Sequence, residues 1–362
     1  MNIFILIMLI FTFLGLLDKI LNNKMGLCES FDQGMNTMGT LALSMLGFYC
    51  IAVTFVSHHV DEITAFSQML HIDPSIMIGC LLAPDLGGYN IIHTLSNQEG
   101  MVILAGLILT STVGTVISFQ LPLFLTALDR KDVQFYIRGL IYGMIVIPVV
   151  MIPLGLILKI EQLLFVLLPV FVICLMLVLG LVFIQKTTMR FLTWFGQVIR
   201  ILSLIFFMMV IVTCYYDGFG LTSMKLIQEG MMIVFKCSMI VIGSMILCDL
   251  ILKYFSCYID KLAAFLGVNH YSIIGLFLQL ATSVAVFPIF SKMDEKGKIL
   301  NGAMSVSGAY VLGAQLGFVA SVDSMHVSIY ICAKFKLLTT FLKNRNEMTT
   351  ENNSAIGKAN QT

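Results

Sequence analysis

Long apolar runs separated by short polar segments dominate the chain. A helix that crosses a lipid bilayer needs about 20 mostly apolar residues, because it rises about 1.5 Å per residue across about 30 Å of hydrocarbon. Nine runs meet this length, and each predicts a membrane-spanning helix: residues 2–21, 37–57, 100–127, 132–158, 162–185, 194–215, 230–252, 298–321 and 325–342. The pattern therefore predicts an all-α polytopic membrane protein.

Two further apolar segments are broken by polar residues, glycine or proline. The first, residues 74–93, is interrupted by the sequence PDLGG at 84–88. The second, residues 270–290, carries a group of polar residues and a proline: Gln279, Thr282, Ser283 and Pro288. The helix before the first break would be about 15 Å long, or about half of the bilayer. We expect both segments to be re-entrant hairpins made of broken helices. The alternative is that both cross the membrane, which would give eleven spans and a parallel repeat.

The two halves of the chain are related by a shift of 196 residues. Without gaps, the shift aligns four pairs of glycines: Gly34 with Gly230, Gly47 with Gly243, Gly79 with Gly275, and Gly106 with Gly302. It also superimposes the two broken segments. We interpret the chain as an internal duplication with three parts: a first repeat at 1–158 with its hairpin near 74–93, a connecting transmembrane helix at 159–193, and a second repeat at 194–342 with its hairpin near 270–290.

Positive charges predict the orientation, because short loops rich in Lys and Arg stay on the cytoplasmic side. They mark six cytoplasmic segments: Lys19 with Lys24, Arg130 with Lys131, Lys186 with Arg190, Lys253 with Lys261, Lys292 with Lys296 and Lys298, and the tail with Lys343 and Arg345. Lys159, Lys225 and Lys236 are exceptions. Loops 58–73 and 94–99 carry none, so the first hairpin begins and ends outside. The second begins and ends inside, which inverts the second repeat relative to the first. The polar tail, 343–362, predicts cytoplasmic disorder.

Composition excludes several classes of function. Of 362 residues, 59% are hydrophobic and only 11% are charged, and the mean hydropathy is +0.97. A net charge of +1 leaves no basic surface for nucleic acid. The nine cysteines have no metal-ligand spacing, and the HExxH and GxSxG motifs are absent. We predict a transporter rather than an enzyme, with no metal or cofactor, and Na⁺ or H⁺ coupling stays open.

Asp85, within the first break, is the main candidate for substrate binding. A charged side chain at the bilayer centre costs about 2.5–3.5 kcal/mol on insertion scales, so its presence requires a reason. The carboxylate, together with carbonyl groups freed around Gly87 and Gly88, suits a cation such as a protonated amine. Tyr89 could cover that cation through a cation–π contact. The alternative is that Asp85 only caps the helix after the break.

Other polar side chains on the predicted spans are candidates for the same site. The second hairpin offers Gln279, Thr282 and Ser283 as neutral donors and acceptors, with ordinary interhelical hydrogen bonding as the alternative. Four more complete the set: Asn90, Ser111, Thr112 and Gln315. At the cytoplasmic end of span 37–57, Asp32 and Gln33 are candidates for a gate. For Asp32, a role as an N-terminal helix acid is the alternative.

Several stretches resemble the bacterial ethanolamine utilisation permease (EutH) family. The resemblance runs through residues 31–48, 73–88, 106–122 and 138–155 and resumes at 292–320, so that it covers most of the chain. The PDLGG break and the sequence LGAQLGF at 312–318 are its most specific parts. The chain departs from the family pattern at five positions where that pattern has polar or charged residues: Gln33, Thr282, Ser283, Ala314 and Gln315.

The resemblance implies a permease that takes up ethanolamine across the bacterial cytoplasmic membrane. Its partners would be a small-molecule substrate and the lipid bilayer, and the oligomeric state stays open. Because of the departures, two alternatives remain: a secondary transporter for another small polar solute and a channel-like facilitator. A membrane-embedded enzyme is the alternative from a different class.

Overall fold

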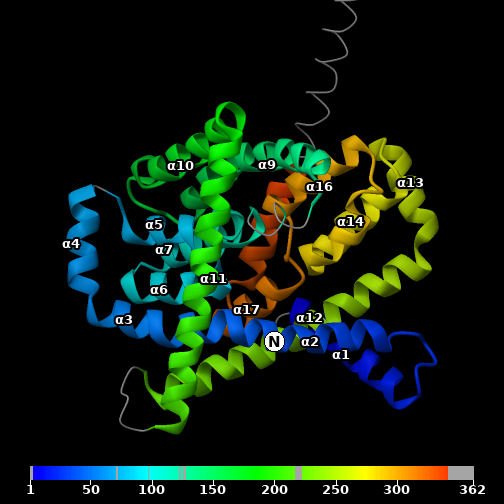
Figure 1. The fold of residues 1–362 in the computed structure, drawn as a ribbon, viewed down its shortest axis with the longest axis horizontal. Helices are drawn as coiled ribbons and strands as arrows, with labels where there is room; N and C mark the ends of the chain where they lie inside the picture. The colour runs from blue at the N-terminus through cyan, green and yellow to red at the C-terminus, as the bar shows by residue number, and fades with distance from the viewer. Residues whose placement is uncertain are drawn as a thin grey trace, which may run out of the picture.

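The computed structural model describes residues 3–70, 72–96, 98–121, 124, 128–216 and 222–340, which are mostly helical and include no strand (Figure 1). Six of their helices are long and apolar enough to cross a membrane: α1 (Ile3–Ile20), the continuous helix Glu99–Gln120, α9 (Arg130–Ile157), α10 (Leu163–Phe183), α11 (Gln185–Tyr215) and α12 (Met224–Tyr254). They correspond to six of the nine predicted spans. The predicted disordered tail, 343–362, lies outside the described residues.

The predicted span 37–57 lies within a longer helical run. The run consists of α2 (Cys28–Leu41), the π-helical stretches η1 (Ala42–Leu46) and η2 (Phe48–Ala52), and α3 (Val53–His58), and α4 (Val60–Leu70) follows it. Gly47, between the two π-helical stretches, lets the backbone of α11 approach closely. A Cβ atom at this position would lie only 2.6 Å from the backbone nitrogen of Phe207.

The first broken segment folds into two short helices around the predicted break. They are α5 (Pro74–Leu81) and α6 (Gly88–Leu95), joined by the 3₁₀ turn η3 (Pro84–Leu86). Gly87 closes the turn in the left-handed region, with φ of +83°, which favours glycine. Both helices pack on Glu99–Gln120, which consists of α7 (Glu99–Met101), η4 (Val102–Gly114) and η5 (Val116–Gln120).

The second broken segment also breaks where the sequence predicts. It comprises α14 (His270–Ala281), the 3₁₀ turn η6 (Ser283–Val286) and α15 (Phe287–Phe290), and α13 (Ser256–Leu266) precedes it. The axes of α13 and α14 differ in direction by 106°. The helix α14 packs on α16 (Glu295–Ser307), where Gly275 allows close contact with Asn301.

The prediction of one continuous span at 298–321 is wrong. The helix α16 ends at Ser307, and α17 (Ala314–Val322) begins after a turn in which Tyr310 has φ of +61°. The backbone N–H of Tyr310 donates to the Gln279 carbonyl at 2.8 Å, and that of Leu312 donates to the Leu280 carbonyl at 3.0 Å. These carbonyls belong to the last turn of α14 and lack partners within their own helix. The turn between α16 and α17 and the C-terminal end of α14 therefore satisfy each other's free backbone groups.

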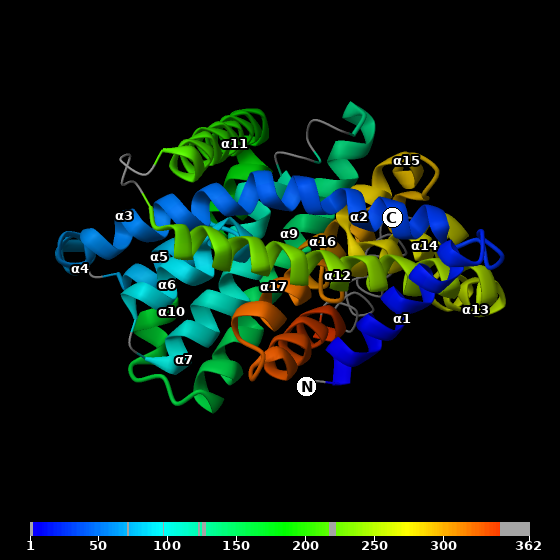
Figure 2. The ribbon, with the colours of Figure 1, turned by 90° about the horizontal axis from the view of Figure 1, so that it is seen from below.

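The two broken segments lie on opposite sides of the centre, inward of α4 and α13, with α16 and α17 between them (Figure 1). Along one side, the run from α2 to α3 lies beside α12 (Figure 2). The last described helical residues, 327–340, match most of the predicted span 325–342. This arrangement brings the two breaks toward the centre of the fold.

We expect Gly139→Ala to destabilise the protein. A Cβ atom at Gly139 would overlap the Ile299 carbonyl oxygen of α16 and lie 2.8 Å from the Ala303 nitrogen, so α9 and α16 would have to separate. Overpacking of this kind costs about 1–3 kcal/mol. Thermal unfolding of the purified protein in detergent measures the effect. Gly39→Ala is the matched control, because a Cβ at Gly39 meets nothing within 4 Å. Equal midpoints for the two variants would contradict this account of the α9–α16 contact.

Candidate substrate-binding site

The 3₁₀ turn of the first hairpin holds Asp85 in the interior of the fold. Its half-buried carboxylate lies close enough to three side chains to interact with them electrostatically: Cys237 of α12, Tyr310 of the turn after α16, and Tyr330 of the last helix. The N-terminal cap of α6 is Gly87, and no side chain caps this helix end. The geometry therefore gives no support to the alternative that Asp85 is only a cap.

No cationic side chain neutralises Asp85 within the described part of the chain. Each ion pair found there involves other acids, as at Asp132, which lies 2.7 Å from the Lys298 ammonium. Even a half-buried carboxylate without a partner loses part of its hydration, which carries a cost in a low-dielectric interior. Asp85 is therefore available to a cation that comes from outside the protein.

Residues of the second hairpin approach the same region, although Gln279 is already engaged. Its side-chain amide nitrogen donates to the Asn301 backbone carbonyl at 3.1 Å and to the Asn301 side-chain oxygen at 2.9 Å. Ser283 is buried beside Tyr310 and accepts a hydrogen bond from Gln120 at 3.5 Å. Thr282 is the C-terminal cap of α14. The break thus presents Ser283 to the centre, whereas Gln279 joins two helices.

The three polar candidates on the neighbouring helices are also bonded within the protein. The Gln315 amide nitrogen donates to the Thr115 hydroxyl at 2.8 Å, and its oxygen accepts from the Tyr330 hydroxyl at 3.2 Å. The hydroxyls of Ser111 and Thr112 donate to the carbonyl of Ile108 in their own helix. Gln315 thus joins neighbouring helices, whereas the hydroxyls of Ser111 and Thr112 are satisfied within their own helix.

Lys334 is a buried charge-bearing group that the sequence analysis missed. Its side chain is 1% exposed, and its ammonium nitrogen donates to the Ser111 carbonyl at 2.8 Å. No acidic group lies within 4 Å of this nitrogen in the described residues. The sequence could have revealed Lys334, because a lysine in the middle of the predicted span 325–342 places a charge where it is costly.

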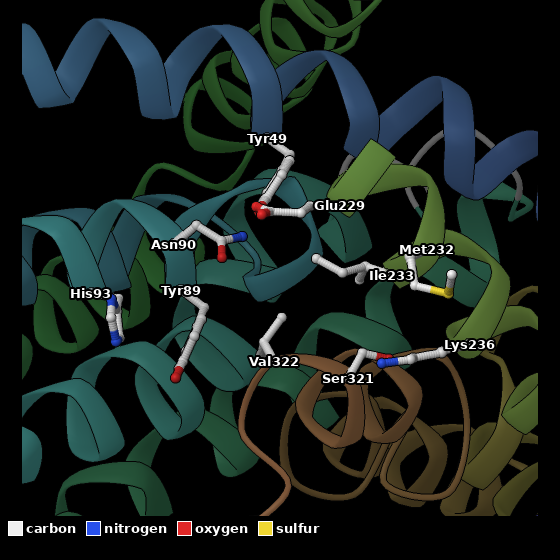
Figure 3. A pocket seen from close by; sticks show the side chains of 10 residues that line it. All are labelled: Tyr49, Tyr89, Asn90, His93, Glu229, Met232, Ile233, Lys236, Ser321 and Val322. Carbon is white, nitrogen blue, oxygen red and sulfur yellow. The ribbon is translucent and has the colours of Figure 1, made fainter. Parts of the chain in front are cut away.

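An open cavity of about 350 Å³ lies beside the first hairpin (Figure 3). Four elements supply its ten lining residues: Tyr49 from η2; Tyr89, Asn90 and His93 from α6; Glu229, Met232, Ile233 and Lys236 from α12; and Ser321 and Val322 from α17. The amide nitrogen of Asn90 is buried without a hydrogen-bond partner among the described residues. This nitrogen is a free donor at the wall of the cavity.

The cavity is connected to Asp85 through Cys237 of α12. Cys237 follows Lys236, which lines the cavity, it bonds with Ser321, and it lies within electrostatic range of the Asp85 carboxylate. At the opposite wall, the Tyr49 hydroxyl donates to the Glu229 carboxylate at 3.3 Å. Sequence reasoning missed Glu229 and Lys236 because nothing local distinguishes the α12 face that borders the cavity from its lipid-facing sides.

Tyr89 lines this cavity, and both its hydroxyl and its ring contact neighbouring side chains. Its hydroxyl donates to Asp323 at 3.3 Å, and its ring packs edge-on against Phe318 with centroids 6.0 Å apart. Gly87 and Gly88 form the turn before it, and a Cβ at Gly88 would lie 2.8 Å from the Ala83 carbonyl oxygen. The geometry of the hairpin thus requires both glycines.

The proposed gate residues lie away from the cavity, on an exposed face of α2. Asp32 forms an ion pair with Lys19 of α1, and Gln33 donates to Glu29 at 3.2 Å. Because α2 begins at Cys28, Asp32 lies in its second turn, and the alternative role as an N-terminal helix acid is wrong. Among the described residues, no group of three potential metal ligands occurs.

The sequence profile described as "Ethanolamine utilisation protein, EutH" matches residues 1–339. A "Probable ethanolamine permease EutH" of Listeria monocytogenes is 32% identical over 89% of this chain and 87% of its own length. A protein of the same name from Salmonella typhimurium is 26% identical over 90% of this chain and 85% of its own length. The "Uncharacterized protein YxeR" of Bacillus subtilis is 25% identical, with coverages of 91% and 90%. No solved structure gives a significant match.

We expect Lys334→Met to raise the thermal stability of the protein. The substitution removes an ammonium group that is buried without an acidic partner, and methionine fills a similar volume. The Ser111 carbonyl keeps its place in the helix, so that little hydrogen bonding is lost. Unfolding midpoints in detergent test this expectation, with the exposed Lys336→Met on the same helix as the control. A lower midpoint for Lys334→Met alone would mean that the bond to Ser111 outweighs the cost of burial.

Proposed function

The chain belongs to the EutH family of ethanolamine utilisation proteins, and on this premise we propose that it is a multi-pass membrane permease for ethanolamine or a similar small amine cation. The relatives named as probable ethanolamine permeases support this substrate. The six long apolar helices support a location in the membrane, which we assign to the bacterial cytoplasmic membrane. The function is transport and not catalysis.

The single observation that carries the proposal is the un-neutralised carboxylate of Asp85 at the tip of the first hairpin. A primary amine is protonated at neutral pH, as the lysine ammonium is, and its charge matches this carboxylate. Ser283 and the Tyr310 hydroxyl, on the opposite side of the centre, bind the hydroxyl end of the substrate. Gln279 and Gln315 keep a structural role, because their side chains already bond to neighbouring helices.

The substrate reaches Asp85 through the cavity beside α6 and α12. Glu229 attracts a cation at the wall of this cavity, and the free amide donor of Asn90 offers a partner to its hydroxyl. The cavity, at about 350 Å³, is roomy for a solute of this size. The path ends where Ser321, Cys237 and Asp85 meet.

We further propose that the chain consists of two repeats, as the shift of 196 residues suggested. Helix boundaries support this proposal. The run Cys28–His58 corresponds to α12 (Met224–Tyr254), and α4 (Val60–Leu70) corresponds to α13 (Ser256–Leu266), with no difference at either end. The equivalent caps of α5 and α14 also match. In each, a side chain, Asp73 or Asn269, accepts a bond from a backbone N–H of the first turn.

Reciprocal contacts support an inverted relation between the two repeats. Gly34 of α2 packs against Ile242 of α12, and the equivalent Gly230 of α12 packs against Leu46, the equivalent of Ile242. Such exchange of partners is expected of a two-fold axis. Because position 34 meets 242 and position 46 meets 230, the two helices are antiparallel. Equivalent spans that run in opposite directions belong to repeats that are inverted in the membrane.

We expect Asp85→Asn to abolish saturable ethanolamine uptake while leaving the protein folded. Asparagine keeps the shape of the side chain but removes the charge. At an effective dielectric of about 20, a charge pair at about 4 Å is worth about 4 kcal/mol before desolvation, so binding should weaken about tenfold or more. Uptake of labelled ethanolamine into proteoliposomes measures the loss.

Asp61→Asn is the matched control for this experiment, because Asp61 is exposed on α4 and distant in sequence from the breaks. Both variants must be monodisperse in detergent before reconstitution. If folded Asp85→Asn takes up ethanolamine like the parent, Asp85 is not the counter-charge. Uptake that fails to saturate in the parent would favour a channel-like facilitator.

We expect cysteine labelling to place the two hairpins on opposite sides of the membrane. On a cysteine-free background, Glu62→Cys and Glu99→Cys should react with an impermeant maleimide from outside, whereas Lys131→Cys and Lys296→Cys should react from inside. All four positions are exposed in the structure, so protection would reflect the membrane. External labelling at position 131 would rule out the inverted topology.

A further inference from the structure

One face of α2 is polar although α2 is part of an apolar chain. Gln33, Asn36, Thr37 and Thr40 follow the spacing i, i+3, i+4 and i+7, which places them on one side of the helix. Gln33, Asn36 and Thr40 are exposed, and Thr37 is partly exposed. On the opposite side of the helix, Met35 is 38% exposed and apolar. The helix therefore has one side suited to lipid and one suited to water.

Contact with hydrocarbon would be unfavourable for this polar face. The two threonine hydroxyls donate to carbonyls of their own helix, at Gly34 and Thr37, so they place little demand on their surroundings. The Asn36 side chain, by contrast, has no hydrogen-bond partner among the described residues. An unpaired amide in lipid is costly, whereas at a water-filled space it is satisfied.

A second, independent observation comes from the other half of the chain. The shift of 196 residues carries Gln33, Asn36, Thr37 and Thr40 onto Glu229, Met232, Ile233 and Lys236. These four are the α12 residues that line the cavity of Figure 3. The reciprocal packing of α2 and α12 gives the two faces equivalent positions about the two-fold axis.

We propose that this face of α2 lines an inner vestibule, through which the small amine cation leaves toward the cytoplasm. The inference rests on the proposed function and on the inverted repeat. The second hairpin supplies the facing wall, because Ala285, Val286 and Ile289 are the equivalents of Tyr89, Asn90 and His93. The outer cavity carries charged side chains at Glu229 and Lys236, where the inner vestibule has the neutral Gln33 and Thr40.

Single cysteines at Asn36 and Thr40, on a cysteine-free background, test the proposal. An impermeant maleimide applied to the cytoplasmic side of vesicles should label both positions roughly tenfold faster than Met35→Cys, because the thiolate forms in water and not in lipid. Met35→Cys is the matched control, one residue away on the apolar side. Labelling at Asn36→Cys and Thr40→Cys should also block ethanolamine exchange.

The outcomes of this experiment distinguish failure of the proposed vestibule from failure of the proposed substrate. Labelling no faster than at Met35→Cys, or labelling from the outside, would overturn the vestibule. Fast labelling from the inside supports it, because the reaction requires no substrate. If labelling is fast but ethanolamine is not exchanged even before modification, the vestibule stands and the proposed substrate is wrong.

Discussion

The centre of this protein depends on the hydrogen bonding of backbone groups that become free where helices break. A membrane offers no water to such groups, so each must find a partner within the protein. The turn after α16 donates its N–H groups to the last carbonyls of α14, and the Ala83 N–H of the first hairpin donates to the Ser118 hydroxyl at 3.2 Å. The end of α14 and the turn after α16 thus satisfy each other, while the first hairpin is anchored to the helix Glu99–Gln120.

The positions of the breaks explain why several polar side chains lie together in one part of the fold. Asp85, Ser283 and Tyr310 belong to segments that are far apart in the sequence, yet each lies at a break. Other interior charges have partners: Asp132 pairs with Lys298, and Asp18 accepts hydrogen bonds from the backbone N–H groups of Met25 and Leu27. Half-buried Asp85 and buried Lys334 have no ion-pair partner among the described residues, and a low-dielectric environment strengthens the electrostatic interactions of such groups.

In the proposed duplication, the two repeats share their helix boundaries and close glycine contacts but not their charged side chains. Glycines at helix contacts and the helix boundaries recur at a spacing of 196 residues, because close backbone approach tolerates no side chain. The charged side chains do not recur in the same way. Asp85 corresponds to Ala281, and Glu229 corresponds to Gln33. Two similar halves thus provide an asymmetric path, with more charge on one side than on the other.

The sequence alone determined the features that arise from local physics. Apolar run length located six long helices, because the thickness of the bilayer sets the length of a span. The PDLGG sequence located the first break, because a proline followed closely by two glycines disfavours a continuous helix, and Gly87 takes a positive φ there. Asp85 was identified for the same reason, since a charge within an apolar segment is visible without any knowledge of its neighbours.

Only the tertiary structure decided the features that depend on distant partners. The break between α16 and α17 was invisible in the sequence, because the carbonyls that stabilise it belong to α14. The hydrogen-bond partners of Gln279 and Gln315, which include Asn301 and Thr115, were also set by the tertiary structure. Likewise, four elements combine to line the cavity. A sequence shows which groups need partners, but the fold decides which of them remain free for a substrate.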